Sequence, residues 1–181
     1  MKNILILGAG LSSTSLIKYL LDQSDGQNWH ITLGDIDENS ARKKIDNHPR
    51  GTAVAFDIFN EEQKELFISS SDIIVSLLPP RMHQIVAITC LKHRKNFVTA
   101  SYVSEEIKQL DEQARNLGVI FLNEIGVDPG IDHMSAMKMI DWIRSEGGKL
   151  DIFESSTGGL VAPDCDNNPW RYKFTWNPRN V

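Results

Sequence analysis

The sequence predicts an α/β protein with a doubly wound parallel sheet, and two observations support this prediction. A continuous apolar run at residues 4–7 is typical of a strand that is buried on both faces of a parallel sheet. Short apolar strands and amphipathic helices then alternate as far as residue 122. The chain has 181 residues, of which 41% are hydrophobic, so it is long enough for one globular domain and part of a second.

A glycine loop follows the first predicted strand at once. Gly8 allows a tight turn out of the strand, and Gly10 lets a pyrophosphate approach the backbone. The helix predicted after the loop directs free N–H groups and its positive dipole end at the phosphates. This context favours a Rossmann dinucleotide-binding domain over a purely structural turn. The predicted cofactor contacts in the loop are Gly8, Gly10, Leu11, Ser12 and Ser13, the last in place of the usual third glycine or alanine.

An acidic residue ends the second predicted strand, which covers residues 29–33. Asp35 lies about 20 residues beyond the loop, where an acid binds the ribose hydroxyls of NAD in this fold. The alternative is that the acid starts a helix, a role that Asp37 suits better. A basic run at residues 42–44 follows, and it is interpreted either as a solvated helix face or as a contact for the 2′-phosphate of NADP.

The remaining strands and helices are predicted in alternating order. The strands cover residues 52–56, 72–78, 96–99 and 119–122. The helices cover residues 60–70, 83–92 and 104–117, with Asn60 and Ser104 as N-caps and Gly118 just past the last helix.

Residues at the carboxyl ends of these strands should border the cofactor crevice. Leu78 and Thr99 are therefore predicted to line it, and Asp57 is placed either near the adenine ring or in a plain turn. His83 is interpreted as a helix cap or surface histidine, and Cys90 as a core thiol.

A polar loop at residues 123–134 follows the last predicted strand and leads into a helix. A strand at residues 149–157 and an aromatic, basic stretch at residues 168–176 come next. That stretch is interpreted either as core or as the wall of a site for an anionic ligand, in which Arg171 and Lys173 pair with carboxylates.

Three segments, residues 126–134, 158–163 and 168–179, together resemble saccharopine dehydrogenase of the glutamate-forming type. The similarity runs from Ile4 to Val181 in matching order. It implies an NADP-linked oxidoreductase of lysine metabolism that interconverts saccharopine with glutamate and aminoadipate semialdehyde. Members of the family are longer than this chain. The resemblance therefore implies a Rossmann domain over residues 1–128, followed at 129–181 by the truncated start of an α+β substrate domain, and a fragment that is inactive alone.

The sequence departs from the family at two positions. Asp35 stands where fungal members commonly carry a basic residue, so the resemblance implies NADP whereas Asp35 favours NAD. Thr157 replaces a cysteine that is frequent in the family, so no catalytic thiol is carried over.

The chemistry that the resemblance implies needs a general acid/base and groups that hold carboxylates. Asp128 is the candidate general acid/base, on a loop predicted to lie beside the nicotinamide, and Val127 is a predicted cofactor contact on the same loop. Tyr102 is the second catalytic candidate. Ser101, Tyr102, Asp128 and Arg171 are the predicted substrate contacts. Alternatively, Asp128 only caps the helix that begins near Ile131.

Two other functions stay open: a related dehydrogenase that acts on lysine or carboxynorspermidine, and a dinucleotide-binding module without turnover. The net charge of −5 gives no reason to expect nucleic acid or an anionic membrane as a partner. The cysteines, Cys90 and Cys165, form no ligand cluster, so no metal is predicted, and their use fits the cytoplasm. A homodimer through the second domain is possible on this interpretation.

Overall fold

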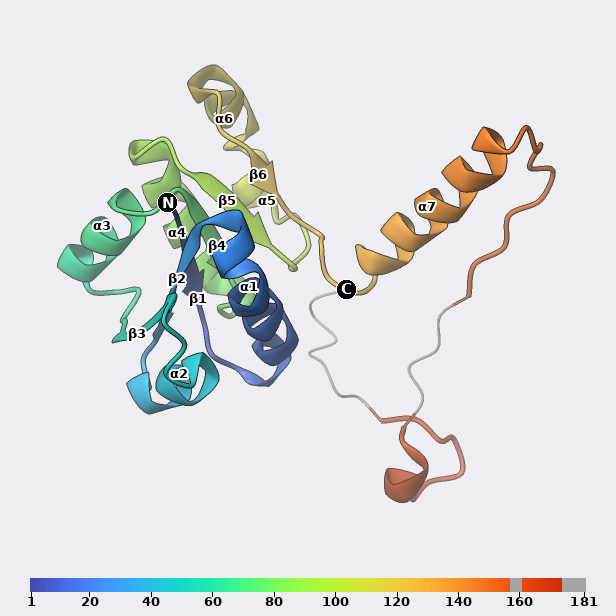
Figure 1. The fold of residues 1–181 in the computed structure, drawn as a ribbon, viewed down its shortest axis with the longest axis horizontal. Coiled ribbons are helices and arrows are strands. Elements are labelled where there is room, and N and C mark those ends of the chain that lie inside the picture. Colours follow the sequence, from blue (N-terminus) through green and yellow to red (C-terminus); the bar gives the residue numbers. More distant parts are fainter. Residues whose placement is uncertain (157–160, 174–181) are drawn as a thin grey trace. The chain divides into compact units, whose positions relative to one another are not determined.

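The computed structural model describes residues 1–156 and 161–173, and the chain divides into two compact units, Met1–Ile131 and Asp132–Val181. The first unit contains a six-stranded parallel sheet with the strand order β3-β2-β1-β4-β5-β6 (Figure 1). The strands are β1 (Lys2–Leu7), β2 (Trp29–Asp35), β3 (Gly51–Ala55), β4 (Ile73–Ser76), β5 (Asn96–Thr99) and β6 (Phe121–Leu122). The predicted doubly wound parallel sheet is confirmed.

Helices cover both faces of this sheet. They are α1 (Thr14–Gln27), preceded by a 3₁₀ turn at Leu11–Ser13, α2 (Glu38–Ile45), α3 (Glu61–Ser69), α4 (Pro80–Lys92), α5 (Glu105–Lys108) and α6 (Asp111–Leu117). Asp37, Asn60 and Ser104 each accept a hydrogen bond from a backbone N–H in the first turn of α2, α3 and α5, as predicted for helix N-caps.

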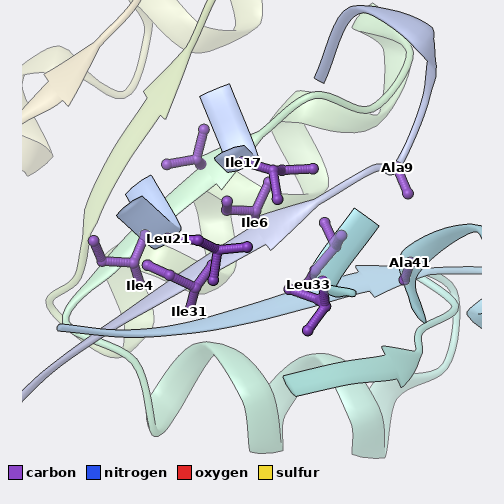
Figure 2. Packing of buried hydrophobic residues seen from close by; sticks show 10 residues of the cluster. Ile4, Ile6, Ala9, Ile17, Leu21, Ile31, Leu33 and Ala41 are labelled. Carbon is purple, nitrogen blue, oxygen red and sulfur yellow. The ribbon is translucent and has the colours of Figure 1, made fainter. Parts of the chain in front are cut away.

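The alternation of side chains along β1 builds two cores, one on each face. Ile4 and Ile6 pack against α1 and β2 in a cluster that also contains Ile17, Leu21, Ile31 and Leu33 (Figure 2). Leu5 and Leu7 point to the opposite face, where they meet side chains of α3, α4 and β5. Cys90 belongs to this second cluster, so the predicted core thiol is confirmed, and burial raises its pKa.

The order of the strands reverses at β1, and this defines the edge at which a ligand binds in doubly wound sheets. β1 pairs with β2 on one side and with β4 on the other, so that Leu7 lies between Gly34 and Ser76. The loops that follow these three strands therefore meet at one place. The glycine loop leaves β1 there.

Two expectations of secondary structure are wrong. The helix predicted over 104–117 is divided into α5 and α6, because the Leu110 N–H bonds to the Ile107 carbonyl and tightens the turn. Residues 149–156 form no strand, because they have no partner strand among the described residues; Thr157 lies outside that part of the chain. Leu11, one of the predicted cofactor contacts, is fully exposed in the 3₁₀ turn.

In the second unit, the long helix α7 (Ile131–Ser145) begins at the last residue of the first unit, and a 3₁₀ turn covers Pro163–Cys165. Ile152 and Trp170 expose most of their side chains. Within the described ranges, none of the helices combines the length and apolar character needed to cross a bilayer.

Candidate functional site

The glycine loop is held in a shape that requires glycine at its first position. Gly8 has a φ of +107°, and a Cβ atom there would lie 2.9 Å from the Leu77 carbonyl oxygen. At Gly10, by contrast, an added Cβ would meet nothing within 4 Å. The space outside Gly10 is therefore open, as a loop that cradles a pyrophosphate requires.

We expect Gly8→Ala to lower the free energy of unfolding by about 2 kcal/mol or more, because the left-handed φ and the contact with Leu77 both oppose a side chain. Gly118→Ala is the matched control, because Gly118 also has a positive φ but has open space where the Cβ would lie. Urea unfolding of both variants separates the cost of the positive φ, which both glycines share, from the cost of the contact with Leu77, which only Gly8 has. Equal losses would show that the Leu77 contact contributes nothing.

Asp35 holds the loop directly. Its Oδ2 accepts a hydrogen bond of 2.6 Å from the Ala9 N–H, and its Oδ1 accepts one of 2.9 Å from the Asp37 N–H. A carboxylate has further lone pairs, so these bonds leave room for a ribose hydroxyl. The structure thus places Asp35 against the glycine loop, and the ribose contact stays a prediction.

Lys44 holds the loop from the other side. Its Nζ donates to the Gly10 carbonyl at 2.6 Å, to Ser13 Oγ at 3.0 Å and to Thr14 Oγ1 at 2.6 Å. An ammonium group has three donors, and all three are used here. Lys44 is therefore neither a solvated cation nor free for a 2′-phosphate, whereas Arg42 pairs with Glu38 on its own helix.

Four polar side chains meet at the carboxyl ends of β4 and β5. His83, in the first turn of α4, lies 2.9 Å from Ser76 Oγ through Nδ1 and 2.7 Å from Ser101 Oγ through Nε2. Thr99 Oγ1 lies 3.4 Å from the same Nε2 and accepts the Ser101 N–H. The expectation of a cap or surface histidine is wrong, because His83 is only 4% exposed. Burial lowers its pKa to about 4, so the imidazole is neutral at pH 7.

The loop that carries Asp128 closes on itself. The Gly126 N–H bonds to the Pro129 carbonyl and the Ile131 N–H to the Gly126 carbonyl, both at 3.0 Å. Gly130, with a φ of +144°, has no room for a Cβ beside Gly126. Asp128, which precedes a cis proline bond, is exposed.

This loop is tied to the segment after β5. The Glu124 N–H bonds to the Ser101 carbonyl at 3.0 Å, and Glu124 Oε1 accepts the Val103 N–H at 3.0 Å. These bonds place the segment with Ser101 and Tyr102 beside the loop that leads to Asp128. The role of Glu124 as this link cannot be predicted from the sequence, because its two bonds reach residues more than twenty positions away.

A cavity of about 1360 Å³ extends along the face of the sheet beyond α1. Its walls include Ile73, Val75 and Val98, so most of it covers apolar strand surface. Only its rim at the carboxyl edge contains predicted site residues, which are Ser12, Thr99 and Val127. It is larger than an ordinary ligand site, and only that rim meets the edge where the dinucleotide is predicted to bind.

Three predicted site residues have structural partners of their own. Asp57 Oδ1 accepts the Phe59 N–H at 2.9 Å, which is a turn contact. Leu78 packs partly against the second core cluster. Arg171, in the second unit, pairs with Asp166 at 3.1 Å.

Comparisons with known proteins connect these features to a family. Residues 4–122 match the saccharopine dehydrogenase NADP binding domain, and residues 126–181 match the saccharopine dehydrogenase C-terminal domain. The chain is 39% identical over its full length to a saccharopine dehydrogenase [NADP(+), L-glutamate-forming] of Schizosaccharomyces pombe, and covers 40% of that protein. It is 36% identical over 99% of its length to the mitochondrial alpha-aminoadipic semialdehyde synthase of Rattus norvegicus, and covers 19% of it.

The fold agrees with a solved structure from the same group. The structure of apo saccharopine dehydrogenase (L-Glu forming) from Saccharomyces cerevisiae matches with a TM-score of 0.78 and 32% identity, over 99% of this chain and 39% of the other. The chain thus spans about two fifths of the length of its fungal relatives. Because the NADP-binding match alone covers more than half of the residues, the chain belongs to the saccharopine dehydrogenase family.

Proposed function

We propose that this chain is the dinucleotide-binding portion of an NADP-linked oxidoreductase that acts on saccharopine. The observation that carries the proposal is the glycine loop at the switch point, held by Asp35 and open outside Gly10. The fungal relatives are named for NADP and for glutamate formation, which supports the cofactor and the reaction.

The arrangement suits a dinucleotide that lies across the carboxyl edge of the sheet. The pyrophosphate would contact the backbone of Gly10 and Ser12, where the helix start favours negative charge. The adenosine half would lie over the end of β2, beside Asp35. The other half then falls over the ends of β4 and β5, where Thr99 and Ser101 are located.

The reaction requires a hydride acceptor, which the oxidised nicotinamide supplies when it is bound. The residues of this chain would transfer the proton and bind the substrate carboxylates. We assign to Asp128 the removal of the proton from the substrate amine and the activation of the water that hydrolyses the imine. Tyr102 is assigned a hydrogen bond to the reacting groups, and Arg171 a substrate carboxylate.

The choice between NADP and NAD should depend on the acidic end of β2. Asp37 is exposed, and hydrogen bonds from Ser40 and Asn39 lower its pKa, so it is an anion at pH 7. A negative charge at this position would repel the 2′-phosphate of NADP. Asp35 is the poorer residue to change, because it also holds the Ala9 N–H.

We expect Asp37→Asn to raise the affinity for NADPH relative to NADH several-fold. Asparagine caps a helix as well as aspartate does, so the start of α2 is preserved. Fluorescence titration of the 181-residue protein with both cofactors measures the ratio of dissociation constants. Glu62→Gln, on α3, is the control for the loss of one surface charge. A ratio that stays at the wild-type value in Asp37→Asn would remove this position from the 2′-phosphate site.

Two further assignments complete the proposal. Cys90 and Cys165 are both free, which fits a cytoplasmic location, although the rat relative is named as mitochondrial. A homodimer through the second unit is part of the proposal, and the oligomeric state in solution tests it.

A further inference from the structure

The histidine at the start of α4 connects two hydroxyl groups that belong to different strand ends. Ser76 closes β4 and is fully buried, whereas Ser101 follows β5 and is half-buried. His83 lies between them, at 2.9 Å from one hydroxyl and 2.7 Å from the other. Its ring also meets Phe97 edge-on, with the ring centres 6.3 Å apart, so the imidazole is fixed on its apolar side.

The direction of these hydrogen bonds follows from the buried Ser76 hydroxyl, because its proton requires an acceptor. A neutral imidazole has one donor and one acceptor nitrogen. His83 Nδ1 is the hydrogen-bond partner that the structure gives Ser76 Oγ. If Nδ1 carried the proton, it would donate to Ser76 and leave the Ser76 proton without that acceptor, which is costly for a buried group. The Ser76 O–H therefore donates to Nδ1, and the ring proton is on Nε2.

This tautomer fixes the role of Ser101. Nε2–H donates to Ser101 Oγ at 2.7 Å, so the Ser101 hydroxyl proton must point to another acceptor. The Ser101 carbonyl and N–H are already bonded to Glu124 and Thr99, which holds the backbone in place. Ser101 thus presents an oriented donor at the carboxyl edge of the sheet.

The position of this donor indicates which part of a ligand it meets. Asp35 lies at the end of β2, on one side of the switch point, and Ser101 follows β5 on the other side. We propose that His83 is a positioning residue that aims the Ser101 hydroxyl at an acceptor on the nicotinamide half of the dinucleotide, the carboxamide oxygen. This inference rests on the proposed function and names residues for one half of its cofactor.

The experiment compares two variants that differ little in shape. Glutamine and methionine have similar length, but only glutamine carries an N–H group that can reach the position of Nε2. We expect His83→Met to weaken NADPH binding by roughly threefold to tenfold, the range for one lost hydrogen bond. His83→Gln should stay within about twofold of wild type. Ser101→Ala should reproduce the loss, and His83→Met should add little to it.

A second ligand distinguishes the loss of the nicotinamide contact from a general loss of folded protein. The 2′-phosphate derivative of ADP-ribose contains every part of NADP except the nicotinamide, so all three variants should bind it as wild type does. Equal losses for both ligands, or wild-type NADPH affinity in His83→Met, would overturn the proposal. Nitrogen-15 NMR of the wild-type imidazole should show the Nε2–H tautomer, and the Nδ1–H form would also overturn it. Failure of the wild-type protein to bind either ligand would instead refute the proposed function on which the inference rests.

Discussion

Replacement of Gly10 by valine is expected to abolish dinucleotide binding and to leave the fold intact. The φ and ψ of Gly10 are −64° and 175°, an extended conformation that valine adopts readily. An added Cβ meets nothing within 4 Å in the protein itself. The branched side chain would instead fill the space that the pyrophosphate needs. The affinity should fall by roughly 100-fold or more, which corresponds to about 2.8 kcal/mol.

Titration of the 181-residue protein with NADPH tests this expectation. Gly26→Val is the matched control, because Gly26 also has open space around its Cβ position but lies near the end of α1. Thermal unfolding should show that Gly10→Val keeps its folded state. Unchanged NADPH affinity in this variant would remove the glycine loop from the binding site.

Much of this site can be predicted from the sequence because its determinants are local. Apolar runs such as residues 4–7 define strands that are buried on both faces, and strand, glycine and helix follow one another within a few residues. The N-caps at Asp37 and Asn60 depend on bonds to residues two or three positions later. Such contacts are encoded in short segments of sequence, so spacing is enough to identify them.

The parts that were not predicted depend on contacts between distant segments. His83 is polar and starts a helix, which is typical of an exposed cap. Its burial follows from the packing of α4 on the sheet, which places Ser76 and Ser101 on either side of the ring. Lys44 stands in a basic run on α2, yet its contacts are thirty or more residues earlier in the loop. Only the topology brings these groups together.

The segment at residues 149–156 shows that a local sequence pattern can predict a strand that does not form. Its apolar side chains match the pattern of a strand, and Ile152 and Phe153 are exposed in the structure. A strand is stabilised by hydrogen bonds to a neighbouring strand and by burial of one face. The described part of the chain offers this segment no neighbouring strand, so local propensity alone does not fix its structure.

Replacement of Asp128 by asparagine should reduce turnover strongly and leave cofactor binding unchanged. Because the chain spans about two fifths of its fungal relatives, turnover is measured on a protein of the relatives' full length that contains this chain. Saccharopine-dependent formation of NADPH should fall by ~10²–10⁴-fold, the usual contribution of a general acid/base. Asparagine preserves the shape of the side chain and its ability to cap a helix, but it cannot accept the proton of the substrate amine.

The alternative role of Asp128 makes a different prediction for the same variant. If the residue only supports the start of α7, which begins three residues later at Ile131, asparagine replaces it and turnover stays within a few-fold of wild type. Asp111→Asn is the matched control, because Asp111 lies in the first turn of α6 and its loss removes a negative charge from a helix start. A low kcat with unchanged affinity for NADPH, seen for Asp128→Asn and not for Asp111→Asn, identifies proton transfer as the lost function. Turnover within a few-fold of wild type in both variants would instead assign Asp128 to the helix.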